Sequence, residues 1–191
     1  MYGIEVLVKE HENIQQFNRV VRKMCIRMMD GEEPDLDDFE KVILFVRNYA
    51  DKHHHGKEEE ILFDAMEKYL GETAAKLIRN GMLVEHDLGR LYIRELEEAV
   101  HAYRECVGCE EYKKKETKLN ILMNASGYTS LLNRHIEKEN NVAYTFAERS
   151  LDKSVWKEIN EQTKKFEEMQ DQQKVSETYL NLLRELEEKY Q

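Results

Sequence analysis

The sequence predicts an all-α protein, and three observations support that prediction. The 191 residues include one proline and eight glycines, so residues that interrupt helices are scarce. Glu, Lys, Leu, Met and Arg, which favour helices, dominate the composition. Apolar residues recur at the three- and four-residue spacing of amphipathic helices. We therefore expect an up-down-up-down four-helix bundle, with long helices and short loops, followed by additional C-terminal helices.

The first helix is expected from about Gly3 to about Met29, and His11 lies inside its apolar stripe. That stripe consists of Ile4, Leu7, Val8, His11, Ile14, Cys25 and Met29. The segment MDGEEPD ends this helix, because its glycine and proline suit a loop. Acidic residues in and after it suit the positive N-terminus of the next helix.

The second helix, expected over about residues 36–70, contains the stretch HHHGKEEEILF at residues 53–63. With Ile43 as the core direction, a wheel at about 100° per residue places His54 at about 20° and Glu58 at about 60°. A histidine and a carboxylate four residues apart project from the same side of a helix. We therefore expect His54 and Glu58 to face the core as a pair.

The neighbouring polar residues take other directions on the same wheel. His55, at about 120°, borders the side of Glu58 and can reach an off-centre site. His53 and Glu59, at about −80° and 160°, point outward, so we expect His53 to be a surface residue or a partner that holds a ligand imidazole. Lys57 points inward at about −40°, and we expect its long aliphatic stem to carry the ammonium back to the solvent.

The third and fourth helices are expected over about residues 73–105 and 111–149. His86 is embedded among the apolar residues of the third helix. On the fourth helix, His135 and Glu139 share one face with apolar residues and repeat the four-residue spacing of the pair on the second helix.

Two further features are weaker signals. Cys106 and Cys109 lie in the connection before the fourth helix, and we interpret a single CxxC pair there as two ordinary loop cysteines rather than a redox or metal pair. Tyr128 lies two turns before His135 on the same stripe. It is either a core residue or a hydrogen-bond donor to an oxygen species bound near His135.

The C-terminal remainder is richer in charge and poorer in inward-facing ligand types. We expect Ser154 to cap a short helix there, followed by a last helix. The predicted organisation is thus a bundle over residues 1–150 and a helical extension over residues 151–191, packed across one end or flank of the bundle.

Composition excludes several classes of partner. The formal net charge is −10, from 39 acidic and 29 basic residues, and no basic block is present, so we expect neither nucleic acid nor an anionic membrane surface as partner. The apolar runs are too short to cross a bilayer, and no secretory signal is visible. Three cysteines suit a reducing compartment, so a cytoplasmic location is expected.

The inward histidines and glutamates together predict a metal site. Burying them without a cation would cost several kcal/mol per charged group. Imidazole and carboxylate ligands without thiolate suit iron or manganese, and so many ligands exceed one tetrahedral zinc shell. We expect two ions bridged by Glu58 and Glu139, with coordination positions left open for dioxygen, peroxide, nitric oxide or water.

Four segments, KEHENI, HHHGKEEEILF, VEHDLGR and HIEKENNVAYTF, resemble the hemerythrin-like, or HHE cation-binding, domain family. The resemblance covers about Met1 to Arg149 and implies a non-haem di-iron site, in preference to manganese or zinc. Its implied terminal ligands are His11, His54, His86 and His135, with Glu58 and Glu139 bridging. In relatives the position after the second-helix histidine can also supply a ligand, which makes His55 an additional candidate.

The sequence also departs from that family. Oxygen-carrying hemerythrins have a second histidine one turn after the third-helix ligand, where this chain has Arg90, and a final His and Asp five residues apart, where His135 and Glu139 are four apart. Oxygen carriage therefore does not transfer with the resemblance. HIEKENNV is similar to bacterial di-iron proteins that repair iron–sulphur or nitrosative damage, but the second first-helix histidine and the cysteine-bearing N-terminal domain of those proteins are missing here.

Three kinds of function are compatible with such a site. We favour a protein that binds or senses dioxygen, a related small molecule or iron, with the C-terminal helices as its output element. The alternative is a di-iron enzyme or repair protein acting on peroxide, nitric oxide or damaged iron–sulphur clusters. We favour it less because the sequence shows neither an electron or iron donor nor a nucleophile. The third possible function is a purely structural metal site without turnover. Whether the protein has a protein partner is left open by the sequence.

Overall fold

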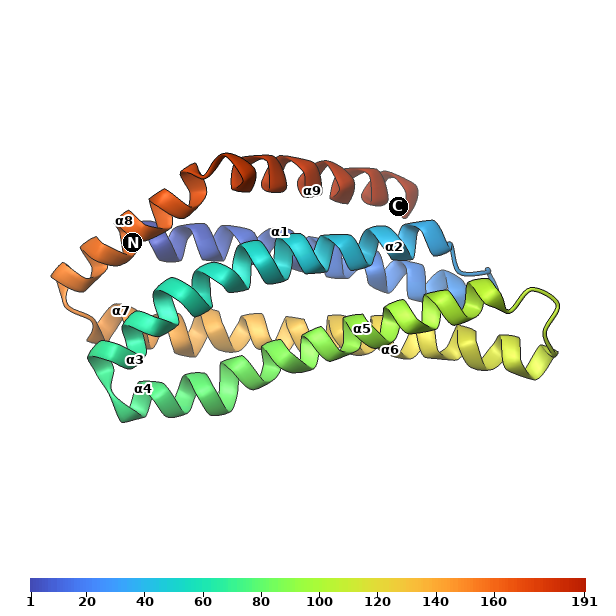
Figure 1. Ribbon diagram of the computed structural model, residues 1–191, viewed down its shortest axis with the longest axis horizontal. Helices are drawn as coiled ribbons and strands as arrows, with labels where there is room; N and C mark the ends of the chain where they lie inside the picture. The colour runs from blue at the N-terminus through green and yellow to red at the C-terminus, as the bar shows by residue number, and fades with distance from the viewer.

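The computed structural model describes the backbone of residues 1–191 and the side chains of residues 1–169 and 174–191. Over this described backbone the protein is helical without strands, and the helices pack as a bundle, which confirms the all-α prediction. The first eleven elements group into four long helical runs along the chain, and Figure 1 shows these runs side by side, each running opposite to the one before it.

Each run has bounds close to those expected from the sequence. The first is α1 (Tyr2–Met29). The second comprises α2 (Leu36–Phe45), η1 (Val46–His55), η2 (Glu58–Phe63) and α3 (Asp64–Leu70). The third comprises α4 (Glu72–Leu77), η3 (Ile78–Met82) and α5 (Leu83–Glu105), and the fourth comprises α6 (Glu111–Lys138), η4 (Glu139–Ala143) and α7 (Tyr144–Ser150).

Local chemistry explains where the runs begin and end. The loop after α1 contains Gly31 at a φ of 104°, in the left-handed region that glycine adopts without strain. Asp35 then caps α2, because its side chain accepts a hydrogen bond of 3.1 Å from the backbone N–H of Asp38. A single residue, Gly71 at a φ of 68°, separates α3 from α4.

Stretches of π-helix interrupt the runs, which the sequence did not predict. η1 carries the three consecutive histidines, η2 begins at Glu58 and η4 begins at Glu139. Hydrogen bonds in a π-helix span one residue more than in an α-helix, and such turns occur frequently at functional sites. A wheel drawn at a constant 100° per residue therefore misplaces side chains across these stretches.

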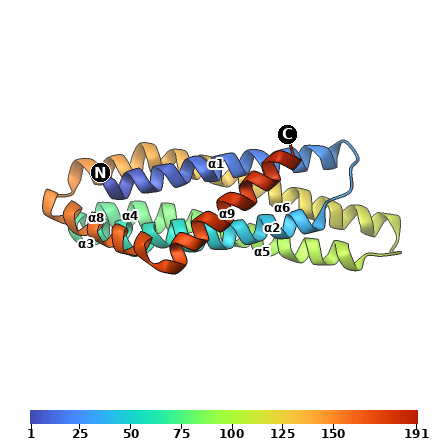
Figure 2. The ribbon, with the colours of Figure 1, turned by 90° about the horizontal axis from the view of Figure 1, so that it is seen from above.

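The C-terminal helices α8 (Lys153–Glu168) and α9 (Gln170–Lys189) lie along one flank of the bundle. α8 contacts α1 and η2, and α9 contacts α1, α2 and η1. Figure 2 shows α9 crossing obliquely over α1 and α2. The prediction that Ser154 caps the first of these helices is wrong, because α8 begins at Lys153, so that Ser154 lies inside the helix and Asp152 takes the cap position.

The connection between α5 and α6 also differs from expectation. Cys106 and Cys109, interpreted from the sequence as two ordinary loop cysteines, are joined in a disulfide. The intervening Gly108 has a φ of 78°, so the short turn uses the conformational freedom of glycine.

The apolar core divides into two clusters, and the predicted metal residues lie between them. On α1, Leu7 belongs to one cluster and Ile14 to the other, with His11 midway. On the third run, Met82 and Ile93 belong to opposite clusters on either side of His86. None of the helices in the described part of the chain combines the length and apolarity needed to cross a bilayer.

Candidate metal centre

The six residues implied as principal ligands meet in the middle of the bundle, completely shielded from solvent. Each of the four histidines is 1% exposed and each of the two glutamates 0%. They are His11, His54, Glu58, His86, His135 and Glu139. The four helical runs each contribute at least one of them, so the site depends on the packing of the whole bundle.

Glu139 lies between imidazoles from three helical runs. Its Oε2 atom is 3.2 Å from Nε2 of His11, whereas its Oε1 atom is 3.1 Å from Nε2 of His135 and 3.6 Å from Nε2 of His86. Glu58 is placed similarly, with its Oε2 atom 3.6 Å from Nε2 of both His54 and His86. Each carboxylate therefore faces histidines from more than one run, as a bridging ligand must.

Several of these inward-facing atoms have no hydrogen-bond partner among the described residues. They are Nε2 of His54, Oε2 of Glu58 and both carboxylate oxygens of Glu139. Buried polar atoms without partners are costly, and carboxylate oxygens and imidazole lone pairs are all donors to a cation. The donor set therefore fits a metal.

The outward-facing Nδ1 atoms of the same imidazoles are each held by an oxygen. The pairs are His11 with Asn140 (2.9 Å), His54 with Glu10 (2.9 Å), His55 with Asp51 (3.3 Å), His86 with Glu59 (2.7 Å) and His135 with Glu85 (2.9 Å). An ionised carboxylate only accepts hydrogen bonds, so the Nδ1 atoms that face one carry the proton and leave Nε2 free to bind metal.

Sequence reasoning missed these outer carboxylates, although a signal for them exists. Glu10 directly precedes His11 but holds His54 on the next run. Glu85 directly precedes His86 but holds His135. In both cases an acidic residue precedes one candidate ligand in the sequence and accepts a hydrogen bond from another candidate ligand on a neighbouring helix.

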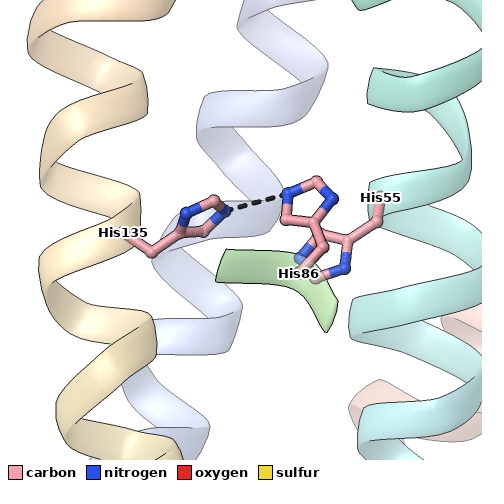
Figure 3. Close-up of side chains that lie close together, drawn as sticks. All are labelled: His55, His86 and His135. Atoms are coloured by element: carbon pink, nitrogen blue, oxygen red, sulfur yellow. Dashed lines mark hydrogen bonds between the residues drawn. The ribbon is translucent and has the colours of Figure 1, made fainter. Parts of the chain in front are cut away.

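His86 and His135 provide a second test of fit. Figure 3 shows their rings meeting through nitrogen atoms, and the two Nε2 atoms are 3.0 Å apart. With both Nδ1 protons donated to carboxylates, the two Nε2 lone pairs face each other. They repel at this distance unless a proton or a cation lies beside them.

His55 joins this part of the site. Its ring is 5% exposed and stacks on that of His86, with centroids 3.8 Å apart. Burial, followed by the neighbouring His86, holds the pKa of His55 well below its ordinary value, so this imidazole stays neutral. The candidate ligand atoms form two groups, each within 4.8 Å: His11, His54, Glu58 and Glu139, and His55, His86 and His135.

The two carboxylates differ in their affinity for protons. Burial and the charge of Glu139 raise the pKa of Glu58 well above its usual value, and the Tyr144 hydroxyl donates a hydrogen bond to Glu58. Burial would also raise the pKa of Glu139, but the surrounding His135, His11 and His86 outweigh it and lower that pKa strongly. Without a cation, one proton is thus held at Glu58 while Glu139 stays ionised.

Two expectations for the stretch at residues 53–63 are wrong. His53 was expected to point outward, but it is 1% exposed because α8 and α9 cover this face. Lys57 was expected to carry its ammonium back to the solvent, but it is also 1% exposed and its ammonium is paired inside the protein. Glu59 is not fully outward either, since it holds Nδ1 of His86.

A cavity of about 100 Å³ adjoins the site on the side of His55 and His86. Apolar side chains form one wall of this cavity: Val46, Ile93 and Leu132. Tyr128 lines it as well, and its buried hydroxyl has no hydrogen-bond partner among the described residues. Arg90 also lines it and is paired with Asp51 and Glu59.

The comparison with protein-family models returns the hemerythrin HHE cation-binding domain over residues 2–147. The chain belongs to this hemerythrin family. Membership indicates that it binds a cation, and the buried histidine and glutamate groups fit a metal site of the hemerythrin domain. Comparisons with curated proteins and with solved structures gave no match.

Proposed function

We propose that this hemerythrin-family protein holds two iron ions and binds or senses dioxygen or a related small molecule at them. The proposed ligands are His11 and His54 for one ion and His86 and His135 for the other, with His55 as an additional ligand to the second. Glu58 and Glu139 would bridge the two ions. The observation that carries this assignment is that Glu139 directs Oε2 at His11 and Oε1 at His86 and His135. Manganese and zinc fit this donor set less well.

The cavity beside His86 supports a small, uncharged ligand. Its volume of about 100 Å³ has room for about three water-sized molecules, so it suits a diatomic gas. Val46, Ile93 and Leu132 make part of its wall apolar, and the charged residues Arg47, Asp51, Glu85 and Arg90 also line it. A reduced iron centre supplies electrons to such a ligand, while the protein controls its entry and hydrogen bonding.

Tyr128 is the group best placed to recognise the ligand. Its buried hydroxyl has no hydrogen-bond partner among the side chains that the structure describes, and burial raises the pKa of this phenol above its ordinary value. The hydroxyl therefore remains a proton-bearing donor. We infer that it donates a hydrogen bond to the small molecule.

The alternative is a di-iron enzyme or repair protein acting on peroxide, nitric oxide or damaged iron–sulphur clusters. One observation favours it: the Tyr144 hydroxyl donates to Glu58, which places a proton donor on a proposed bridging ligand. Reducing peroxide or nitric oxide consumes protons, so such a donor is required. The cavity beside His86, with a volume of about 100 Å³, admits peroxide or nitric oxide but not an iron–sulphur cluster, which weighs against the repair function.

Gas binding by the loaded protein tests the proposal. Protein loaded anaerobically with ferrous iron is exposed to dioxygen and then degassed, and its optical spectrum is recorded at each step. A reversible spectral change supports binding or sensing, whereas irreversible oxidation with peroxide turnover supports the enzyme. Tyr128→Phe should release the gas about tenfold faster, since one hydrogen bond is lost. Tyr92→Phe, on a tyrosine packed at the same helix pair, is the control and should behave as the native protein.

A further inference from the structure

A second buried cluster of charge lies where the bundle meets α8 and α9. It consists of Glu10 on α1, His53 and Lys57 on the second run, Glu167 on α8 and Ser176 on α9. Lys57 is 1% exposed, although lysine is rarely buried unless paired. A buried charge of this kind persists only with compensating partners.

The ammonium of Lys57 is compensated from both sides. It donates hydrogen bonds to Glu10 and to Glu167, and lies 3.1 Å from Nε2 of His53. The ring of Phe166, also on α8, is centred 5.6 Å from the same ammonium. Glu10, His53 and Glu167 bring ligand atoms close enough to hold a metal ion, but the ammonium of Lys57 already lies among them.

Glu10 connects this ammonium to the candidate metal centre. Its Oε1 atom accepts the hydrogen bond from Lys57, while its Oε2 atom is 2.9 Å from Nδ1 of His54. The contacts therefore form an unbroken series from His54 through Glu10 and Lys57 to Glu167 on α8. His53 adds a branch to α9, since its Nε2 atom is 3.1 Å from the Ser176 hydroxyl.

We propose that Lys57 is a positioning residue that couples the metal centre to the docking of α8 and α9. This inference rests on the proposed metal binding and identifies the element that responds to it. A metal held by Nε2 of His54 would make the Nδ1–H of His54 a stronger donor to Glu10. Glu10 would then hold Lys57 more firmly, and Lys57 would hold Glu167 on α8. When α8 undocks, Lys57 loses its contact with Glu167, and Glu10 is then held less firmly against Nδ1 of His54.

Coupling of this kind is reciprocal. If metal binding tightens the docking of α8, a docked α8 raises the metal affinity by the same factor. A hemerythrin domain that uses this series as a sensor would release or mobilise α8 and α9 when its metal is lost.

Glu167→Gln is the primary test, because Glu167 lies on α8, its side chain is 28% exposed and it touches no candidate ligand. It removes the charge that holds Lys57 from outside the bundle. Glu161→Gln, an exposed position on the same helix, is the matched control. Lys57→Met is a second variant that removes the charge and shortens the side chain by only one atom.

Ferrous iron affinity is measured anaerobically by competition with a coloured chelator, and hydrogen exchange is measured for amides of residues 153–168 with and without iron. We expect Glu167→Gln to weaken iron binding about fivefold or more, while Glu161→Gln does not. Iron should slow exchange in α8 of the native protein, and Glu167→Gln should abolish that difference.

The outcomes separate the inference from the proposed function. If the native protein binds no iron, the proposed function fails and the coupling fails with it. If iron binds but α8 exchange is unchanged by iron and Glu167→Gln binds as tightly as Glu161→Gln, the coupling alone is overturned. If Lys57→Met does not fold, Glu167→Gln still tests the coupling, because the side chain at position 167 is partly exposed and the substituted amide can be solvated.

Discussion

Removing the charge of Glu85 tests whether an outer carboxylate prepares His135 for metal. The Glu85 carboxylate accepts a hydrogen bond from Nδ1 of His135 at 2.9 Å and is paired with Lys138. In Glu85→Gln the amide oxygen still accepts that hydrogen bond, but the charge that strengthens it is lost. Losing such a partner weakens metal binding about 10- to 100-fold, or roughly 1.4 to 2.8 kcal/mol.

The metal-free protein separates this effect from a loss of stability. The Glu85 side chain is 18% exposed, so the substituted amide can be solvated, and we expect a change in unfolding free energy below about 1 kcal/mol. Glu95→Gln, at an exposed position on the same helix, is the control. Ferrous iron affinity is measured by anaerobic chelator competition. Equal affinities for Glu85→Gln and Glu95→Gln would refute the reasoning that the Nδ1 partners prepare the ligands.

Three further predictions concern stability. Ferrous iron at about 100 times its dissociation constant should stabilise the fold by about 2.7 kcal/mol per site, or about 5.4 kcal/mol for two sites, and raise Tm by roughly 10–20 °C in calorimetry; an unchanged Tm would contradict binding to the folded state. Asp38→Asn should lower the unfolding free energy by about 1.5–3 kcal/mol at neutral pH, because Lys189, Tyr190 and Lys41 outweigh burial and lower the pKa of Asp38. Because the pKa of Asp38 is lowered in the folded protein, its carboxylate stabilises the fold at pH values above the unfolded pKa of 3.8. The unfolding free energies of the variant and the native protein, measured with denaturant, should therefore converge as the pH falls below about 4. A difference that does not change with pH would exclude this cause. Gly127→Ala should cost about 1–3 kcal/mol in denaturant unfolding, since its Cβ would lie 2.6 Å from the ring of Tyr92, whereas Gly81→Ala, with nothing within 4 Å, should not destabilise.

The long helices were predictable because their apolar stripes and their loop residues agree. The spacing of the stripes also placed one candidate histidine from each run, such as His11 and His86, on an inward face, and the structure brings these side chains together. Their role as ligands remains a prediction. An apolar stripe shows only the direction in which a side chain points from its own helix axis. That direction is sufficient to predict which side chains meet when the inward faces of all the helices point at the same place.

Contacts between helices were not predictable in the same way. A wheel does not show that Glu10 reaches His54, because that depends on which helices are neighbours and on their axial offset. The burial of His53 and Lys57 was missed because α8 and α9 cover a face that a single bundle would leave exposed. The π-helical turns that carry the three histidines also change the directions of their side chains from those of an α-helical wheel.

Metal content of the anaerobically loaded protein tests the central claim most directly. Protein is reconstituted with ferrous iron, freed of unbound metal and analysed for iron and protein, together with His54→Ala and the exposed-histidine control His101→Ala. We predict about two irons per chain in the native protein and in His101→Ala, and a sharp loss in His54→Ala. A single zinc that survives chelation, or iron content that His54→Ala leaves unchanged, would contradict the di-iron account.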